Sequence, residues 1–226
     1  MERTFLTFKI AFGSGKRRVC VCGSLAAPLA LLFVGCGAHR SIDNLRMIDF
    51  ASFSYPVDRA GLEGGPSVGW HWLSPVPNDV VALKGGRHVL DGPEYRGDPH
   101  PSYLQLISVR YGDLTGGGAD EAVVDLLFAT GGTASWHYLY VYRSCHQNRG
   151  VPCLVGILKC GSRADGGLVA TAIRGHLLVL DFFDSAHRVG DCCSSRVIRV
   201  RYRFQGGVFI EQGPREHFDA PSAGSH

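Results

Sequence analysis

The stretch that decides the fold is YGDLTGGGADEAVVD, residues 111–125. A glycine-rich acidic turn in this stretch leads directly into an apolar run that begins at Ala122. Glycine adopts the positive φ angles of tight turns without steric cost, and β-branched residues such as Val123 and Val124 favour strands. The stretch therefore predicts a tight turn followed by a β-strand, with other strands arranged around it.

The acidic turn has two interpretations. Asp113, Thr115, Gly117 and Glu121 stand at relative positions 1, 3, 5 and 9, with Gly118 at position 6, which is the spacing of calcium loops of the EF-hand kind. On this interpretation Asp113, Thr115 and Glu121 bind calcium. On the other interpretation Asp113 caps the turn by accepting hydrogen bonds from backbone N–H groups, and the turn needs no cofactor.

The same turn resembles the D-x-(N/T)-G-D-G-x-x-(D/E) turn of FG-GAP and VCBS-type β-repeats, which often bind calcium. The chain departs from that pattern at Gly117, where the repeats carry an aspartate. The departure removes one carboxylate ligand and one negative charge, and both changes lower the affinity for calcium.

Alternating apolar residues and glycine turns recur along the chain after the first 45 residues. They predict strands at 47–57, 80–83, 88–90, 103–111, 122–128, 136–142, 155–158, 168–173, 176–183, 196–204 and 208–210. Short strands at regular intervals favour an all-β fold, and no amphipathic helix of three turns is apparent. We therefore expect an antiparallel sandwich or a partial propeller-like sheet over residues 46–213, followed by a flexible tail (214–226).

One aromatic pattern lies in the Gly- and Pro-rich segment 58–77, which is expected to be a loop, and one basic pattern lies in the predicted strand 196–204. Trp70 and Trp72 flank His71, so alternation predicts both indoles in the core with His71 outward; the alternative is a surface pair that stacks sugars or holds a partner. Arg199, Arg201 and Arg203 alternate with apolar residues and form a basic ridge on one face of their strand. This ridge either meets an anionic glycan or lipid headgroup, or is a solvated face.

The first 35 residues are typical of an export signal. Lys16, Arg17 and Arg18 precede an apolar run over 19–34 that is shorter than the ~20 residues of a membrane span. The run ends at Phe33–Cys36, which resembles the lipobox of bacterial lipoproteins, with Phe33 in place of the usual leucine. We expect lipidation of Cys36, a tether over 36–45, and a lipoprotein anchored in the membrane of the bacterial cell envelope, in the periplasm or on the outer surface.

Removal of the leader changes the charge of the chain. The leader holds five of the 23 Lys and Arg residues and one of the 20 Asp and Glu residues, so the remainder has 18 basic and 19 acidic residues. A nearly neutral domain without a basic stripe is a poor candidate for binding nucleic acid. The expected partners are the membrane, through the N-terminal lipid, and an envelope protein or glycan.

Five cysteines follow Cys36, and an exported chain uses such cysteines first for disulfides. The candidates are Cys145, Cys153, Cys160, Cys192 and Cys193. Cys145 and Cys153 bracket a polar insert and are expected to close a hairpin loop. We expect one further bond to reach Cys160, and the odd count leaves one thiol unpaired.

Several motifs resemble a family of bacterial exported proteins and lipoproteins. They cover nearly half the chain, in order, as Tyr111–Val124, Gly131–Ala134, Trp136–Tyr142, Ser162–Leu168, Cys192–Cys193 and Arg201–Phe209. The resemblance implies export and a β-rich domain, and it implies no particular activity. Ser194 departs from the family, in which proline often follows the two cysteines.

No G-x-S-x-G, H-E-x-x-H or phosphate-binding loop is present in the sequence. Asp165, Asp181, Asp184 and Asp191 are the acidic residues expected near the two adjacent cysteines. The sequence favours a non-catalytic envelope lipoprotein that acts as a binding or structural module. The alternative is a hydrolase of cell-wall or carbohydrate material that uses these acidic loops.

Overall fold

The computed structural model describes residues 45–57, 69–73, 79–90, 101–130, 132, 134–145, 151–162, 165–189 and 193–220. Residues His39–His226 form one structural unit, and the described residues all belong to it. The expected leader (1–35), Cys36 and the tether up to residue 44 lie outside the described residues. Within the described ranges, no helix has the length and apolar composition that a membrane span requires.

The larger of two main sheets has six antiparallel strands in the order β2-β8-β7-β6-β5-β4. Strands β5 to β8 follow one another in the chain and are neighbours in the sheet. The strands are β2 (His71–Trp72), β4 (Arg87–Val89), β5 (Tyr103–Gly112), β6 (Glu121–Ala129), β7 (Ser135–Arg143) and β8 (Cys153–Lys159).

The second sheet has five strands in the order β14-β13-β10-β9, with β15 beside β14 along the same edge of β13. Its strands are β9 (Leu168–Arg174), β10 (Leu177–Phe183), β13 (Arg196–Gln205), β14 (Val208–Glu211) and β15 (Glu216–Asp219). Two strand pairs complete the unit: β1 (Ser54–Val57) with β3 (Asp79–Ala82), and β11 (Arg188–Val189) with β12 (Cys193–Ser194).

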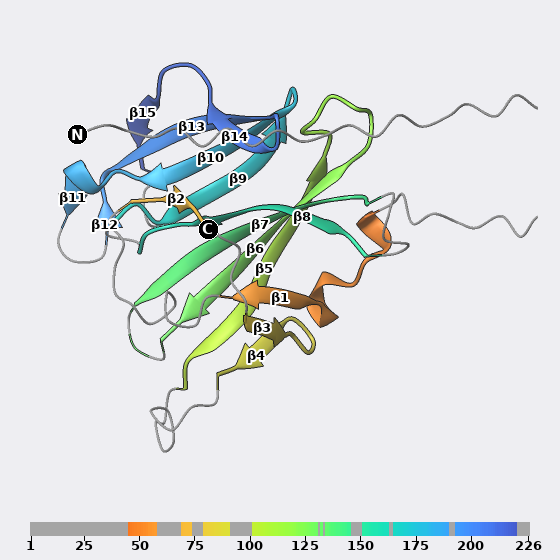
Figure 1. Ribbon diagram of the computed structural model, residues 1–226. Helices are drawn as coiled ribbons and strands as arrows, with labels where there is room; N and C mark the ends of the chain where they lie inside the picture. Colours follow the sequence, from red (N-terminus) through yellow and green to blue (C-terminus); the bar gives the residue numbers. More distant parts are fainter. Residues whose placement is uncertain are drawn as a thin grey trace, which may run out of the picture. The chain divides into compact units, whose positions relative to one another are not determined.

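The six-stranded sheet is the middle layer and is buried on both faces. Val123 of β6 belongs to a core shared with the five-stranded sheet, whereas its neighbour Val124 packs in a second core with β1, β3 and the 3-10 turns at Leu45–Met47 and Phe50–Ser52. Figure 1 shows the five-stranded sheet on one side of strands β5–β8 and β1 and β3 on the other. The predicted all-β antiparallel sandwich is confirmed.

Two predicted hairpins are present with the expected turns. β9 pairs with β10 from Leu177↔Arg174 onward, and β13 pairs with β14 from Gln205↔Val208 onward. In both cases the loop has two residues, and the φ angles within it are positive. Such turns match the right-handed twist of the flanking strands. The β13–β14 turn is the pair Gly206–Gly207, and the β9–β10 turn is Gly175–His176.

Two predictions of strands and the prediction of a flexible tail are wrong. Residues 47–57 form a strand only from Ser54, because two 3-10 turns precede it. The predicted pairing of residues 80–83 with 88–90 is absent, although the Gly85–Gly86 turn between them is present. Instead β3 pairs with β1 and β4 pairs with β5, and Lys84↔Arg87 is an isolated bridge across the turn. The tail predicted from residue 214 is ordered as far as Asp219, because β15 pairs with β13.

Candidate functional site

The acidic turn is organised by the carboxylate of Asp113. Its two oxygens accept hydrogen bonds from the backbone N–H groups of Gly116 (2.6 Å), Gly117 (3.2 Å) and Gly118 (2.8 Å). These hydrogen bonds lower the pKa of Asp113, and the bond from Gly118 has the largest effect. Gly116 and Gly118 have φ angles of 75° and 77°, so the turn requires glycine at these two positions.

Glu121 and Thr115 complete the turn. The Glu121 carboxylate is buried and accepts hydrogen bonds from the backbone N–H of Leu114 (2.7 Å) and the hydroxyl of Thr115 (3.1 Å). Both carboxylates therefore accept hydrogen bonds from N–H or O–H donors within the turn. Among the described residues, no three His, Cys, Asp or Glu side chains are grouped so that they could hold a metal ion. The hydrogen bonds to Asp113 and Glu121 are those of the capping interpretation, and calcium binding at this turn stays a prediction.

A histidine–carboxylate pair lies on the face of the middle sheet that packs against the five-stranded sheet. His137 of β7 contacts Asp125 of β6 through Nδ1, at 2.7 Å from Oδ1. Because the carboxylate oxygen accepts, Nδ1 carries the proton. The Asp125 side chain is 9% exposed and that of His137 is 24% exposed. The sequence did not reveal this pair because its members lie 12 residues apart and meet only through the diagonal register of β6 and β7.

A second group of polar residues lies at the end of β10. The Asp184 carboxylate, 5% exposed, accepts a hydrogen bond from Ala186 N (3.0 Å) and contacts the Nδ1 atoms of His187 (2.8 Å) and His217 (3.4 Å). Burial opposes ionisation of Asp184, but these hydrogen bonds and the charge of His187 outweigh it, so its pKa is lowered. The buried hydroxyl of Ser194 donates to the carbonyl oxygen of Asp184 at 2.6 Å. Asp184 thus joins β10, β12 and β15.

The acidic residues predicted near the two cysteines do not converge. Asp181 makes a two-pronged ion pair with Arg199 (2.7 and 2.8 Å) on the outer face of the five-stranded sheet. Asp165 lies in the turn before β9 and is 3.6 Å from Arg188 Nη1. Asp191 lies outside the described residues. Among the described residues, Asp184 and Asp165 both contact the strand pair that holds Cys193, Asp184 through Ser194 and Asp165 through Arg188, whereas Asp181 does not.

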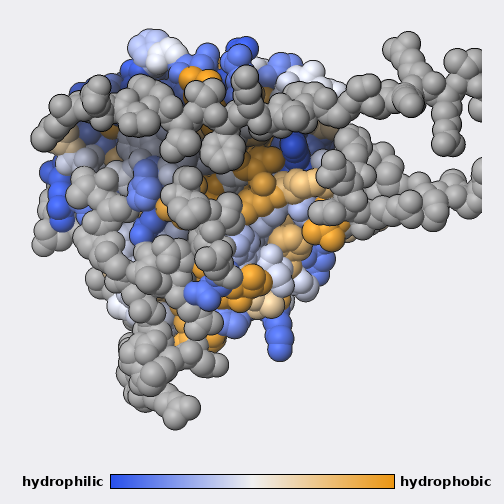
Figure 2. Space-filling view, in the orientation of Figure 1, coloured by the Kyte–Doolittle hydropathy of each residue, from blue (hydrophilic) through white to orange (hydrophobic). Residues whose placement is uncertain are grey.

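The predicted arginine ridge lies on the outer face of the five-stranded sheet, opposite the core residues of β13. Arg199 pairs with Asp181 and lies over the ring of Phe218, 5.0 Å from its centroid. Arg201 pairs with Glu216 at 2.7 Å, and Arg203 is exposed. In Figure 2 hydrophilic residues gather along the top of the view, where β13 and β15 lie.

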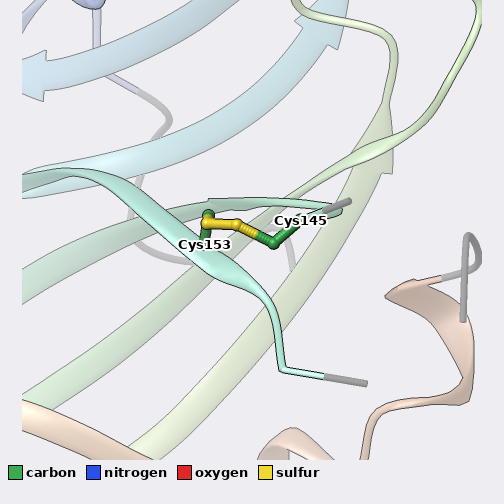
Figure 3. Close-up of a disulfide and its surroundings, with 2 residues drawn as sticks. All are labelled: Cys145 and Cys153. Carbon is green, nitrogen blue, oxygen red and sulfur yellow. A yellow bond between two sulfur atoms is a disulfide. The ribbon is translucent and has the colours of Figure 1, made fainter. Parts of the chain in front are cut away.

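The disulfide between Cys145 and Cys153 is present, with a Cα–Cα distance of 5.4 Å, and it closes the loop between β7 and β8 (Figure 3). Cys160 is a free thiol with no exposed surface, so the bond predicted to reach it is wrong. Its burial raises the pKa of the thiol well above the ordinary value. Cys192 and the side chain of Cys193 lie outside the described residues.

The two tryptophans at β2 are half-buried and pack against the core between the main sheets, on the side that alternation predicted. Trp70 stacks on Phe182 with ring centroids 4.0 Å apart, and Trp72 stacks on Phe209 at 4.1 Å. His71 between them is exposed. Gly156 of β8 leaves space for the second stack, because a Cβ atom there would lie 3.1 Å from both the Phe209 and Trp72 rings.

Comparison with known proteins adds no family to this geometry. No family model matches the chain, and neither the curated proteins nor the solved structures include a significant match. The functional argument therefore depends on the residues themselves.

Proposed function

We propose that the protein is a non-catalytic lipoprotein of the bacterial cell envelope, held at a membrane by a lipid on Cys36. On this proposal the β-sandwich is a binding or structural module, on the periplasmic side or the outer surface. The observation that carries the proposal is the Cys145–Cys153 disulfide behind a leader-like N-terminus. Structural disulfides persist mainly in oxidising compartments, which an exported chain reaches.

The polar groups of the described residues support a non-catalytic role. Three carboxylates accept hydrogen bonds from backbone N–H groups, as side chains that cap turns do: Asp113, Glu121 and Asp184. A hydrolase that uses acidic loops would bring two carboxylates to one reacting bond, within about 10 Å in the glycosidase case. Asp181 instead pairs with Arg199 on the outer face, whereas Asp184 is buried beneath two histidines.

The outer face of the five-stranded sheet is the binding surface that this proposal favours. Arg199, Arg201 and Arg203 are spaced two residues apart on one strand, which places successive guanidinium groups about 7 Å apart along the sheet. Asp181 and Glu216 neutralise two of them, so Arg203 has the most available charge. Such a row suits an anionic glycan or an acidic surface of an envelope protein.

The anchoring step is tested in the native host by mass spectrometry of the membrane fraction. We expect a mature chain that begins at lipidated Cys36, and we expect Cys36→Ser to leave an unprocessed, unlipidated chain. Recovery of the wild-type chain with an intact leader would contradict the proposal.

The binding step is tested with the purified domain, a carboxylated polysaccharide and its neutral counterpart. We expect retention on the anionic polymer alone, with Arg203→Glu weakening it severalfold and the exposed-site control Arg143→Glu leaving it unchanged. Release of new reducing ends from cell-wall or polysaccharide substrates would instead support the hydrolase alternative.

A further inference from the structure

Within the described residues, two-residue turns with positive φ angles at both positions occur at three places, and one of the three is not a pair of glycines. Gly85–Gly86 and Gly206–Gly207 have positive φ angles at both positions. The β9–β10 turn is Gly175–His176, with φ angles of 56° and 62°. Among the described residues His176 is the only non-glycine residue with a positive φ. A side chain in this region costs conformational energy that glycine avoids.

The His176 ring lies against the acidic turn of the other sheet. Its Nδ1 is 3.0 Å from the backbone carbonyl oxygen of Asp113 and 3.5 Å from Oδ2 of the same residue. Both oxygens are acceptors, so the proton is on Nδ1 and the ring donates to Asp113. The contact joins residues 63 positions apart.

The two sheets also approach closely at this corner. A Cβ atom on Gly112, the last residue of β5, would lie 2.8 Å from Cγ2 of Ile173 in β9. Leu114, one residue beyond Asp113, is 1% exposed and belongs to the core shared with the five-stranded sheet. The ring of His176 thus closes a corner that backbone and apolar contacts already bring together.

We propose that His176 is a cross-sheet latch, that is, a side chain whose hydrogen bond to Asp113 stabilises the contact between the two sheets at this corner. On the same proposal the corner folds without a metal ion. In the calcium-binding turns that this sequence resembles, a cation gathers the acidic side chains. Here the N–H groups of Gly116, Gly117 and Gly118 satisfy the Asp113 carboxylate, and His176 donates to the same residue from the opposite sheet. The latch explains why the sequence keeps a strained histidine where its other turns have glycine.

The latch is tested by paired substitutions. Gly206 has the same φ as His176, 62°, and a Cβ atom there would meet nothing within 4 Å, so Gly206→His measures the cost of a histidine without the contact. If the His176 ring made no contribution, His176→Gly would raise Tm by as much as Gly206→His lowers it. We expect a rise less than half as large, or a fall. Changes of equal size and opposite sign would overturn the proposal.

Two further measurements separate the latch from a local effect. Hydrogen exchange at the amides of Gly116 and Gly118 should become severalfold faster in His176→Gly and stay unchanged in Gly206→His; unchanged exchange in both would overturn the latch. Thermal melting of the wild-type domain should give the same Tm in millimolar calcium and in chelator. A calcium-dependent rise in Tm would overturn metal independence, because a ligand that binds only the folded state must stabilise it.

Discussion

The two faces of the six-stranded sheet are buried by different chemistry. The face towards the five-stranded sheet is mostly aliphatic, and its aromatic contacts include the Trp70–Phe182 and Trp72–Phe209 stacks and the edge contact of Trp72 with Tyr202. The face towards the N-terminal segment is rich in tyrosine, and the hydroxyl groups of Tyr55 and Tyr140 bond to backbone carbonyls. The first interface includes a hydrogen bond between side chains, from Trp70 Nε1 to the Tyr202 hydroxyl (2.9 Å), whereas at the second interface tyrosine hydroxyls bond to backbone carbonyls of the covering segment.

The difference follows from what covers each face. Regular strands satisfy their own backbone groups, so a second sheet can cover the first with apolar side chains. The segment at 45–57 includes two 3-10 turns and a short strand, which leave backbone carbonyls without partners in a ladder. Tyr55 donates to Phe50 O (2.7 Å) and Tyr140 donates to Pro56 O (2.8 Å), and burial raises the pKa of both phenols.

The largest effect is expected on the aliphatic face. Phe182 has no exposed surface and stacks on Trp70 with an interplanar angle of 1°. Phe182→Ala should lower the free energy of unfolding by about 3–5 kcal/mol, because it removes a buried ring and leaves a cavity. Denaturant titration measures the change, with the partly exposed Phe204→Ala as a control of smaller effect. Equal losses for the two variants would mean that the stack adds nothing.

An intermediate effect is expected where the two sheets are closest. Gly112→Ala places a methyl group 2.8 Å from Ile173 Cγ2, and we expect a loss of about 1–3 kcal/mol from overpacking. Adding Ile173→Ala should recover part of that loss, which a double-mutant cycle measures. Strict additivity of the two changes would show that the close approach is relieved elsewhere.

The tyrosine face is tested by removing single hydroxyl groups. Tyr140→Phe leaves Pro56 O without its donor and should cost about 1–2 kcal/mol. Tyr142 is the matched control, because its buried hydroxyl has no hydrogen-bond partner among the described residues. We expect Tyr142→Phe to be neutral or stabilising in the same denaturant titration. Equal losses of stability in Tyr140→Phe and Tyr142→Phe would contradict the claim that the hydrogen bond of Tyr140 stabilises this face.

The smallest effect concerns Asp184 at the edge of the five-stranded sheet. Its pKa is lower in the folded protein than in the unfolded chain. Its stabilising contribution is therefore complete above the unfolded pKa and is lost as the pH falls through the folded value. We expect Asp184→Asn to be less stable than the wild type at neutral pH and to show a shallower loss of stability in acid. Parallel pH profiles of Tm would contradict this.

Local patterns in the sequence predicted strands β5 to β8 of the middle sheet and two hairpins, because alternation and glycine turns act over short distances. The same patterns failed for β3 and β4, whose partners lie elsewhere despite a good turn at Gly85–Gly86. β15 was missed because Glu216–Asp219 is polar and is ordered by pairing with β13 rather than by its own composition.

The polar sites show the same limit. The sequence correctly grouped the polar residues of one turn, Asp113, Thr115 and Glu121. It did not reveal which N–H and O–H groups donate hydrogen bonds to the two carboxylates. The contacts from His137 to Asp125 and from His217 to Asp184 depend on register between strands. Spacing along the chain carries no signal for such contacts.

The short strand β2 gives the molecule an internal optical reporter. Trp70 and Trp72 both lie between the two main sheets, whereas Trp136 is buried on the tyrosine-rich face of the middle sheet. Separation of the main sheets would change the fluorescence of the first two indoles, and detachment of the N-terminal segment would change that of the third. Single-tryptophan variants can therefore reveal which layer leaves first when the protein unfolds.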